Sequence, residues 1–134
     1  MNKDLTMLVA FLILAGAIYF YFDDQHREAA LQPIKNNIIA HHRPLVLHFY
    51  ADWCGPCRTY EPMLRRALSP YGNTIDCQDL NIDIAKNRQL LHNCGASGIP
   101  TTVIFDRKGN KVAKETGCLR TEELDKYLRQ AVAY

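Results

Sequence analysis

Apolar residues are concentrated at the start of the chain, in a stretch that differs from everything after it. An uncharged apolar run begins at Met7 and ends with Phe22, directly before two aspartates. A helix over residues 5–22 is about 27 Å long at roughly 1.5 Å per residue, close to the ~30 Å hydrocarbon core of a bilayer. Tyr19 and Tyr21 lie at its outer end, where amphipathic rings prefer the interface with water. The pattern predicts a single membrane-spanning anchor over residues 1–22.

A cleaved signal peptide is the main alternative for this run. Ala15, Gly16 and Ala17 provide small residues at the spacing that a signal peptidase accepts. A buried globular helix is disfavoured, because the run has no polar face to present to water. We expect the anchor to export the rest of the chain, which places the domain outside the cytoplasm, on the periplasmic side.

Beyond the run, short apolar segments alternate with amphipathic ones. Residues 23–33 are polar and predict a tether, in which Pro33 should interrupt any helix. The run at 45–50 is apolar except for His48, which is typical of a central strand buried on both faces. The pattern predicts further strands at 75–82, 101–105 and 111–116, and helices at 34–42, 54–68, 85–92 and from Thr121 onward.

The order of these elements predicts the fold class. It is β-α-β followed by α-β-β-α, which implies an α/β domain with a mixed sheet covered by helices on both faces. The 134 residues suffice for one such domain, over 34–134. Hydrophobic residues make up 48% of the chain and charged residues 22%, so we expect a buried core. The net charge of +2 and the mixing of both signs argue against a nucleic-acid partner.

Two cysteines stand where the central strand passes into a helix. Cys54 and Cys57 are separated by Gly55 and Pro56, so both face the same side of a first helical turn and are close enough for a disulfide. Unpaired N–H groups at the helix N-terminus favour a thiolate at Cys54, which we predict to be the nucleophile. Cys57, one turn deeper, is then the resolving thiol.

At this point the sequence resembles the thioredoxin family over residues 45–132. Trp53 precedes the Cys-Gly-Pro-Cys motif, and Pro62 follows it where the family has a helix kink. The segment 80–83 resembles the end of the family's second strand, and 98–101 resembles the segment that carries its cis-proline. The resemblance implies a thioredoxin-like fold and a thiol:disulfide oxidoreductase activity.

The resemblance also implies a substrate-docking surface beside Cys54. A cis Pro100 would present the backbone of Ile99 to an extended peptide and keep metals away from the cysteine pair. Trp53 has core packing as its alternative, and Pro100 an ordinary trans turn. The predicted substrate-binding residues are Trp53, Gly55, Pro56, Gly98, Ile99, Pro100, Gly117 and Cys118.

The sequence departs from the family at two positions. His48 stands six residues before Cys54, where the family typically has a buried Asp that passes protons to the resolving cysteine. Asp79 stands where many members have a Lys that partners that Asp. We predict that His48 and Asp79 face each other across adjacent strands and that His48 relays the proton of Cys57. The alternative for His48 is a core residue without a catalytic part.

Three further cysteines leave an odd total. Cys77 fits a small buried side chain within a strand, while Cys118 is the best candidate for an additional reactive thiol. A zinc site formed by Cys54, Cys57, Cys94 and His92 is a weak alternative, because structural zinc sites favour a second closely spaced pair of ligands. We therefore expect neither a metal nor a cofactor.

These observations predict an enzyme that reduces disulfides in exported protein substrates. Gly55 and Pro56 match the dipeptide of the reducing thioredoxins, whereas oxidants and isomerases usually have a His there. An exported reductase needs a membrane or soluble electron donor, whose identity the sequence does not give. An oxidase or isomerase is one alternative, and a docking or assembly module with incidental redox chemistry is another. We expect a monomer.

Overall fold

The computed structural model describes residues 2–133; Met1 and Tyr134, the outer ends of the predicted anchor and domain, lie outside this range. The helices are α1 (Lys3–His41), α2 (Gly55–Leu68), α3 (Ala85–Asn93) and α4 (Thr121–Ala133), with a 3₁₀ segment η1 (Ser69–Thr74). The strands are β1 (Leu45–Tyr50), β2 (Asp76–Asn81), β3 (Thr101–Phe105) and β4 (Lys111–Thr116). The predicted order of strands and helices in the domain is confirmed.

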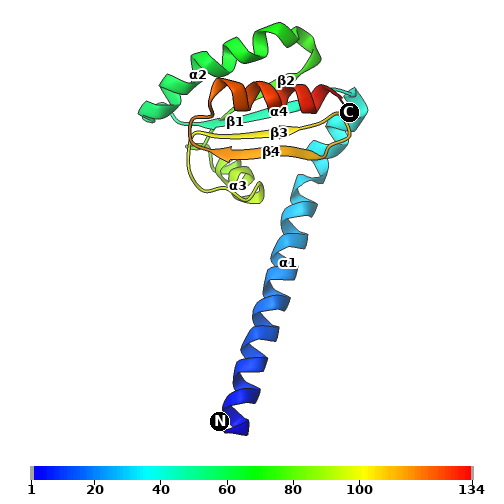
Figure 1. Cartoon of the computed structure of the whole chain (residues 1–134), viewed down its shortest axis with the longest axis vertical. Helices are drawn as coiled ribbons and strands as arrows, with labels where there is room; N and C mark the ends of the chain where they lie inside the picture. The colour runs from blue at the N-terminus through cyan, green and yellow to red at the C-terminus, as the bar shows by residue number, and fades with distance from the viewer. Residues whose placement is uncertain (1, 134) are drawn as a thin grey trace.

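The four strands form one mixed sheet in the order β2-β1-β3-β4. β1 pairs with β2 in parallel and with β3 antiparallel, and β3 and β4 form an antiparallel hairpin. β1 is therefore central, as its apolar run predicts, and five of its six residues are buried. The carboxyl end of β1 leads into α2, which places the start of that helix at one edge of the sheet (Figure 1).

Helices cover both faces of the sheet. Figure 1 shows α2 and α4 on one side of the strands and α3 on the other. Because side chains alternate along a strand, β1 sends Val46 toward α2 and α4, while Leu47 and Phe49 enter the core beneath α3 and the end of α1. The sheet thus separates two apolar layers, and His48 lies on the same face as Val46.

Residues 23–33, predicted to be a tether interrupted at Pro33, are part of the continuous helix α1. The helix continues from the apolar run through Pro33 to His41, without the expected break. Pro33 removes one hydrogen bond, at a cost of about 3 kcal/mol in a helix interior. Leu31 and Ile38, on either side of it, are both buried in the domain core, and their burial offsets that cost. The predicted short helix at 34–42 is the last part of α1.

The first half of α1 projects from the domain (Figure 1). Its large apolar side chains, from Leu5 to Phe22, leave between 47% and 76% of their surface exposed. By length and composition, α1 contains a stretch that can cross a membrane, and none of that stretch is buried against the rest of the chain.

Candidate active site

The predicted cysteine pair stands at the N-terminus of α2. Cys54 is the N-cap, and its Sγ accepts a hydrogen bond from the backbone N–H of Cys57 at 3.3 Å. Pro56 lies in the first turn, where a missing N–H removes no intrahelical bond. A disulfide joins Cys54 and Cys57, whose Cα atoms are 5.3 Å apart. In the reduced state, the same N–H group and the helix dipole would favour a thiolate at Cys54.

The disulfide lies in a small apolar cluster. Cys54, Cys57 and Ala51 are its buried members, and Ile82 and Ile99 pack against them. Both cysteines are buried in the disulfide form, so burial does not indicate which of them is the nucleophile. The backbone N–H that donates to the sulfur of Cys54 favours Cys54 as the nucleophile.

Two loops close against this cluster at the predicted docking surface. The peptide bond between Ile99 and Pro100 is cis, as expected, and the N–H of Gly117 donates to the carbonyl of Pro100 at 2.7 Å. Gly117 has a φ of +103°, in the region that favours glycine. At Gly98, a Cβ atom would lie 3.1 Å from Cγ2 of Thr116, which is a tight contact. Gly98, Ile99, Pro100 and Gly117 are thus brought together as predicted.

Trp53 lies on the surface beside the disulfide. Its side chain is 66% exposed, and its Nε1 donates a hydrogen bond to Oδ1 of Asp83 at 3.1 Å. The alternative of core packing for Trp53 is therefore wrong. Asp83, at the end of the segment 80–83, fixes the indole, a contact that the sequence alone did not indicate.

Cys118 lies on the other side of the α2 N-terminus. It is exposed, and its thiol donates to the carbonyl of Pro56 at 3.6 Å. With Tyr60 and Met63 of α2, it lines a groove between that helix and the loop before α4. The structure therefore brings Cys118 next to the cysteine motif, as predicted.

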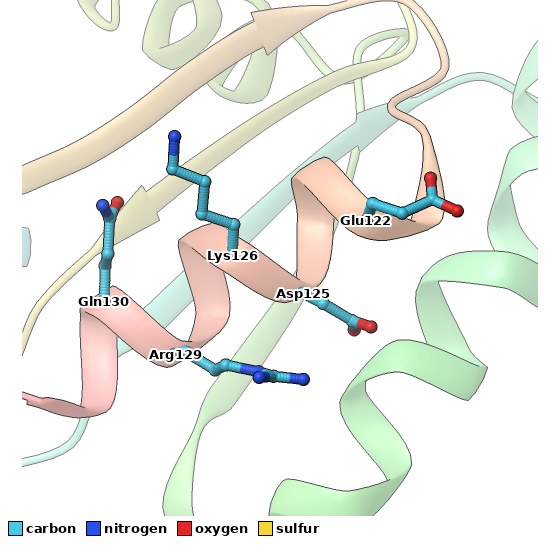
Figure 2. Close-up of a pocket in the computed structure, with 5 residues that line it drawn as sticks. All are labelled: Glu122, Asp125, Lys126, Arg129 and Gln130. Atoms are coloured by element: carbon cyan, nitrogen blue, oxygen red, sulfur yellow. The ribbon is translucent and has the colours of Figure 1, made fainter.

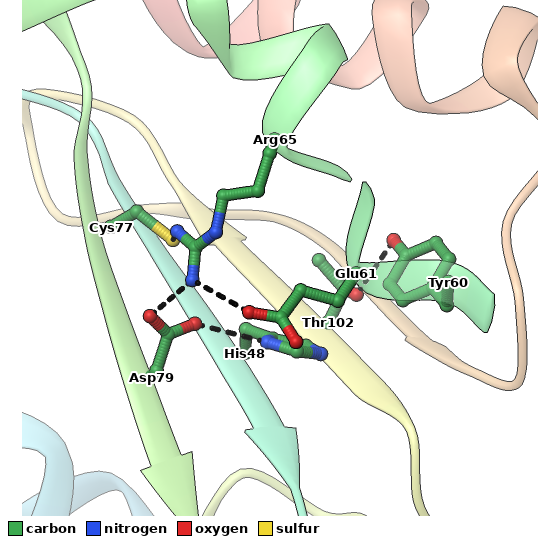
Figure 3. A network of polar contacts seen from close by, with 7 residues as sticks. All are labelled: His48, Tyr60, Glu61, Arg65, Cys77, Asp79 and Thr102. Atoms are coloured by element: carbon green, nitrogen blue, oxygen red, sulfur yellow. Dashed lines mark hydrogen bonds and ion pairs between the residues drawn. The ribbon is translucent and has the colours of Figure 1, made fainter. Parts of the chain in front are cut away.

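His48 and Asp79 occupy paired positions on β1 and β2. The Nδ1 of His48 and Oδ1 of Asp79 are 3.0 Å apart, which confirms the predicted contact (Figure 3). His48 is buried, whereas the side chain of Asp79 is 35% exposed. The other ring nitrogen of His48, Nε2, is buried and has no hydrogen-bond partner among residues 2–133.

Comparison with known proteins decides the family. The thioredoxin family model matches residues 28–130, a range that includes every predicted site residue. The chain belongs to the thioredoxin family. The disulfide at the start of α2 lies within the range that the family model matches.

Individual relatives agree with this assignment. The thioredoxin-like protein HCF164, chloroplastic, of Oryza sativa subsp. japonica is 29% identical over 88% of this chain and 48% of its own length. The thiol:disulfide interchange protein TxlA homolog of Synechocystis sp. is 26% identical over 98% of this chain and 77% of its own length. The chain spans about half the length of the HCF164 relatives.

A solved structure supports the fold. It comes from a study of the thiol resolving mechanism in yeast mitochondrial 1-Cys peroxiredoxin via glutathione/thioredoxin systems. It matches with a TM-score of 0.60 and 25% identity, over 75% of this chain and 89% of its own.

Arg65 is a part of the thioredoxin site that the sequence did not reveal. Its guanidinium forms a hydrogen-bonded ion pair with Oδ2 of Asp79, and its Nη2 lies 3.5 Å from Oε1 of Glu61 (Figure 3). Partial burial opposes ionisation of Asp79, but the hydrogen bonds from Arg65 and His48 outweigh it and hold the pKa of that carboxyl below its usual value. In the sequence, Arg65 appears only as an i,i+4 partner of Glu61, a pattern typical of a solvated helix face.

The other two free cysteines, Cys77 and Cys94, form thiolates less readily than an ordinary cysteine because their pKa values are raised. Burial, followed by the charge of Asp79, raises the pKa of the Cys77 thiol to about 11. Burial raises the pKa of the Cys94 thiol to about 11 as well. Cys94 packs in the apolar layer under α3, and residues 2–133 contain no group of three or more side chains that could hold a metal. Cys94 therefore lies in a different apolar cluster from the disulfide-bonded Cys54 and Cys57, with which it was considered as a zinc ligand.

A hollow along α4 lies outside the predicted site. Its lining side chains all project from that one helix, and they carry charges of both signs (Figure 2). None of them belongs to the cysteine cluster, although Glu122 also lines the groove beside Cys118. We interpret the hollow as part of the solvent-exposed face of α4. Its lining residues are Glu122, Asp125, Lys126, Arg129 and Gln130.

Proposed function

We propose that this chain is a membrane-anchored monomer that reduces disulfides of proteins outside the cytoplasm. The observation that carries the proposal is the Cys54 and Cys57 pair at the N-terminus of α2, with a backbone N–H donated to the sulfur of Cys54. This position stabilises the charged form of the attacking sulfur and leaves Cys57 one turn further into the helix.

The reaction proceeds through two exchanges. The Cys54 thiolate attacks one sulfur of a substrate disulfide, a mixed disulfide forms, and the other substrate sulfur leaves as a thiolate. The sulfur of Cys57 then loses its proton and attacks Cys54, which closes the pair and releases the second substrate thiolate. The substrate gains two electrons and the pair loses two.

His48 is the base in the second exchange. Ionised Asp79 accepts the Nδ1–H of the neutral imidazole, which leaves the lone pair on Nε2 free of any partner among residues 2–133. Tyr60 of α2, the helix that carries Cys57, lies against the ring of His48, and we propose that the unpartnered Nε2 takes the proton of Cys57. Asp79 orients the ring and balances the imidazolium that forms, as a carboxylate does in other histidine bases.

Substrates dock across the two loops and the tryptophan beside the disulfide. Trp53 is exposed and fixed by Asp83, and Ile99 packs against the cysteine cluster. Cys118 lines the neighbouring groove along α2. These features support an extended peptide lying against Ile99 and reaching into the groove beside Cys118.

The exposed half of α1 supports the proposed membrane anchor. Apolar side chains that are about half exposed or more over several helical turns are unfavourable in water and favourable in lipid. Tyr19 and Tyr21, at 76% and 61% exposed, lie where the helix would leave the bilayer. The part of α1 that packs on the domain continues from the same helix, so an uncleaved chain is held close to the membrane.

A trapping experiment tests the function. With Cys57→Ser, the mixed disulfide on Cys54 cannot resolve, so cells should accumulate adducts with proteins outside the cytoplasm. The Cys54→Ser, Cys57→Ser double variant should show none, and Cys57→Ser with Cys118→Ser should still trap. If the double variant supports the same cellular phenotype as the unchanged chain, the domain is a docking module. A reduction potential near those of oxidants would favour the oxidase alternative.

A second experiment tests His48. The reduced protein is mixed with an aromatic disulfide, whose two thiolates are released in two phases that report attack by Cys54 and resolution by Cys57. His48→Ala should slow the second phase by roughly 10²-fold near pH 7, the lower end of what a positioned base supplies. It should also remove the fall in that rate toward low pH. If the rate and its pH dependence between about 5 and 8 are unchanged, His48 is only a core residue.

A further inference from the structure

We propose that Arg65 is a positioning residue for the resolving exchange: it holds the Asp79 carboxylate in place and compensates its charge, so that His48 stays a neutral base. This inference rests on the proposed role of His48. Arg65 lies eight positions after Cys57 on the same helix. It acts through Asp79 and not on the disulfide itself.

The carboxylate of Asp79 connects two side chains from different elements. Its Oδ1 contacts Nδ1 of His48 on β1, and its Oδ2 is bound by the guanidinium of Arg65 on α2 (Figure 3). The three side chains run from solvent to core, with exposures of 43% for Arg65, 35% for Asp79 and 1% for His48. Both carboxylate oxygens are thus engaged, and the carboxylate cannot turn away from His48 without breaking the ion pair.

The charge on Arg65 affects which form of His48 is stable. An uncompensated carboxylate beside an imidazole favours imidazolium, which has no lone pair left to accept a proton. A guanidinium on the far side of the carboxylate offsets that negative charge and favours the neutral ring. Glu61 opposes this effect, because it lies near the same guanidinium. Its contact of 3.5 Å is longer than a strong ion-pair hydrogen bond, so Asp79 is the main partner.

The other groups around His48 do not replace Arg65. Tyr60 of α2 lies against the ring of His48, and burial raises the pKa of its phenol, so it stays neutral. Tyr50 of β1 stacks on the ring. Cys77 of β2 lies 3.8 Å from Nη1 of Arg65, and its thiol is uncharged at neutral pH because of its raised pKa. Thr102 of β3 has no charge and bonds to Tyr60. In this network of described side chains, the positive charge beside Asp79 comes from Arg65.

The test measures the pH at which the second phase of thiolate release falls to half of its plateau rate. Arg65→Gln leaves the Asp79 charge uncompensated, so the midpoint should move to higher pH by about half a unit. Below the midpoint, the rate of the second phase should then be about threefold lower than in the unchanged protein. Asp79→Asn should move it in the opposite direction. Arg65→Lys keeps the charge without the planar fork and should restore most of the unchanged profile.

Arg66→Gln is the matched control. Arg66 is the next residue on α2, is exposed and forms none of the ion pairs found within residues 2–133, so its loss should leave the midpoint in place. If Arg65→Gln and Arg66→Gln give the same midpoint while His48→Ala removes the pH dependence, the role of Arg65 is wrong and the role of His48 stands. If His48→Ala keeps the pH dependence, both proposals fail.

Discussion

At the scale of single residues, the contact between His48 and Asp79 joins a buried ring on β1 to a partly exposed carboxylate on β2. The imidazole is buried and the carboxylate is partly exposed, so the group that stays ionised remains near water. This arrangement costs less than burial of a carboxylate, because an ionised group loses far more hydration than a neutral ring. The buried partner of this contact is thus the imidazole, and the side chains of Asp79 and Arg65 stay partly exposed.

Asp79 should make the protein sensitive to acid. Its pKa is lowered in the folded chain, so its stabilising effect is present above the unfolded value of about 3.9 and is lost as pH falls through the folded value. Asp79→Asn should therefore flatten the decline of the free energy of unfolding below about pH 5. Denaturant titrations from pH 3 to 7 measure this. Asp24→Asn, an exposed site without an ion pair within residues 2–133, should keep the decline of the unchanged chain.

Cys54 should react faster with an alkylating reagent than Cys57 in the reduced protein. The backbone N–H at 3.3 Å from its sulfur and the helix N-terminus both favour its thiolate. Mass spectrometry after brief alkylation near pH 7 measures the two rates. Equal rates, or faster labelling of Cys57, would reverse the assignment of nucleophile and resolving thiol.

Part of the site could be predicted residue by residue, and part could not. The cysteine motif, the cis-proline segment and His48 are identified by short, fixed spacing along the chain. The pairing of Asp79 with His48 could also be predicted, because the segment 80–83 resembles the end of the family's second strand and places Asp79 just before it. Arg65 and Asp83 were missed, since each acts through a side chain that is distant in sequence: Arg65 through Asp79 on β2, and Asp83 through Trp53.

At the scale of elements, α1 combines two parts that the sequence pattern separates. The strands β1, β3 and β4 have the predicted bounds, because each is a short apolar or alternating run between turns. The break at Pro33 was wrong because a local helix signal cannot report the burial of Leu31 and Ile38 against strands that come later in the chain. Lys35 also packs against the turn before β4, where a Cβ on Gly109 would lie 3.2 Å from its Cβ.

Leu31 should contribute to the stability of the domain although it lies before the first strand. Leu31→Ala removes a fully buried side chain from the layer under the sheet and should lower the free energy of unfolding by about 2–5 kcal/mol. Ile39→Ala, at a position 47% exposed on the same helix, should change it by no more than about 0.5 kcal/mol. Denaturant unfolding of the detergent-solubilised chain tests both. Equal small effects would mean that α1 does not belong to the folded domain.

At the scale of the whole molecule, the domain and the apolar helix form one continuous structure (Figure 1). α1 is about 58 Å long at roughly 1.5 Å per residue, of which the part up to Phe22 accounts for about half. The remainder ends against the sheet, so the domain would sit close above the bilayer surface. We propose that this position brings the disulfide near proteins at the membrane surface.

The chain should remain with membranes after carbonate extraction, because its exposed apolar run is long enough to span the bilayer core. Protease added outside the inner membrane should digest the domain. A soluble product that begins near Ile18 would instead show cleavage after the small residues at 15–17, and a protected domain would place it in the cytoplasm.

The redox state of the cysteine pair in living cells tests the central claim most directly. Rapid acid quenching, followed by an alkylating mass tag, reports how much of Cys54 and Cys57 carries free thiols. A reductase supplied by an electron donor should have the pair mostly reduced in the membrane fraction, and loss of the donor should convert it to the disulfide. A pair that stays oxidised in growing cells would contradict the claim and make the chain an oxidant of its substrates.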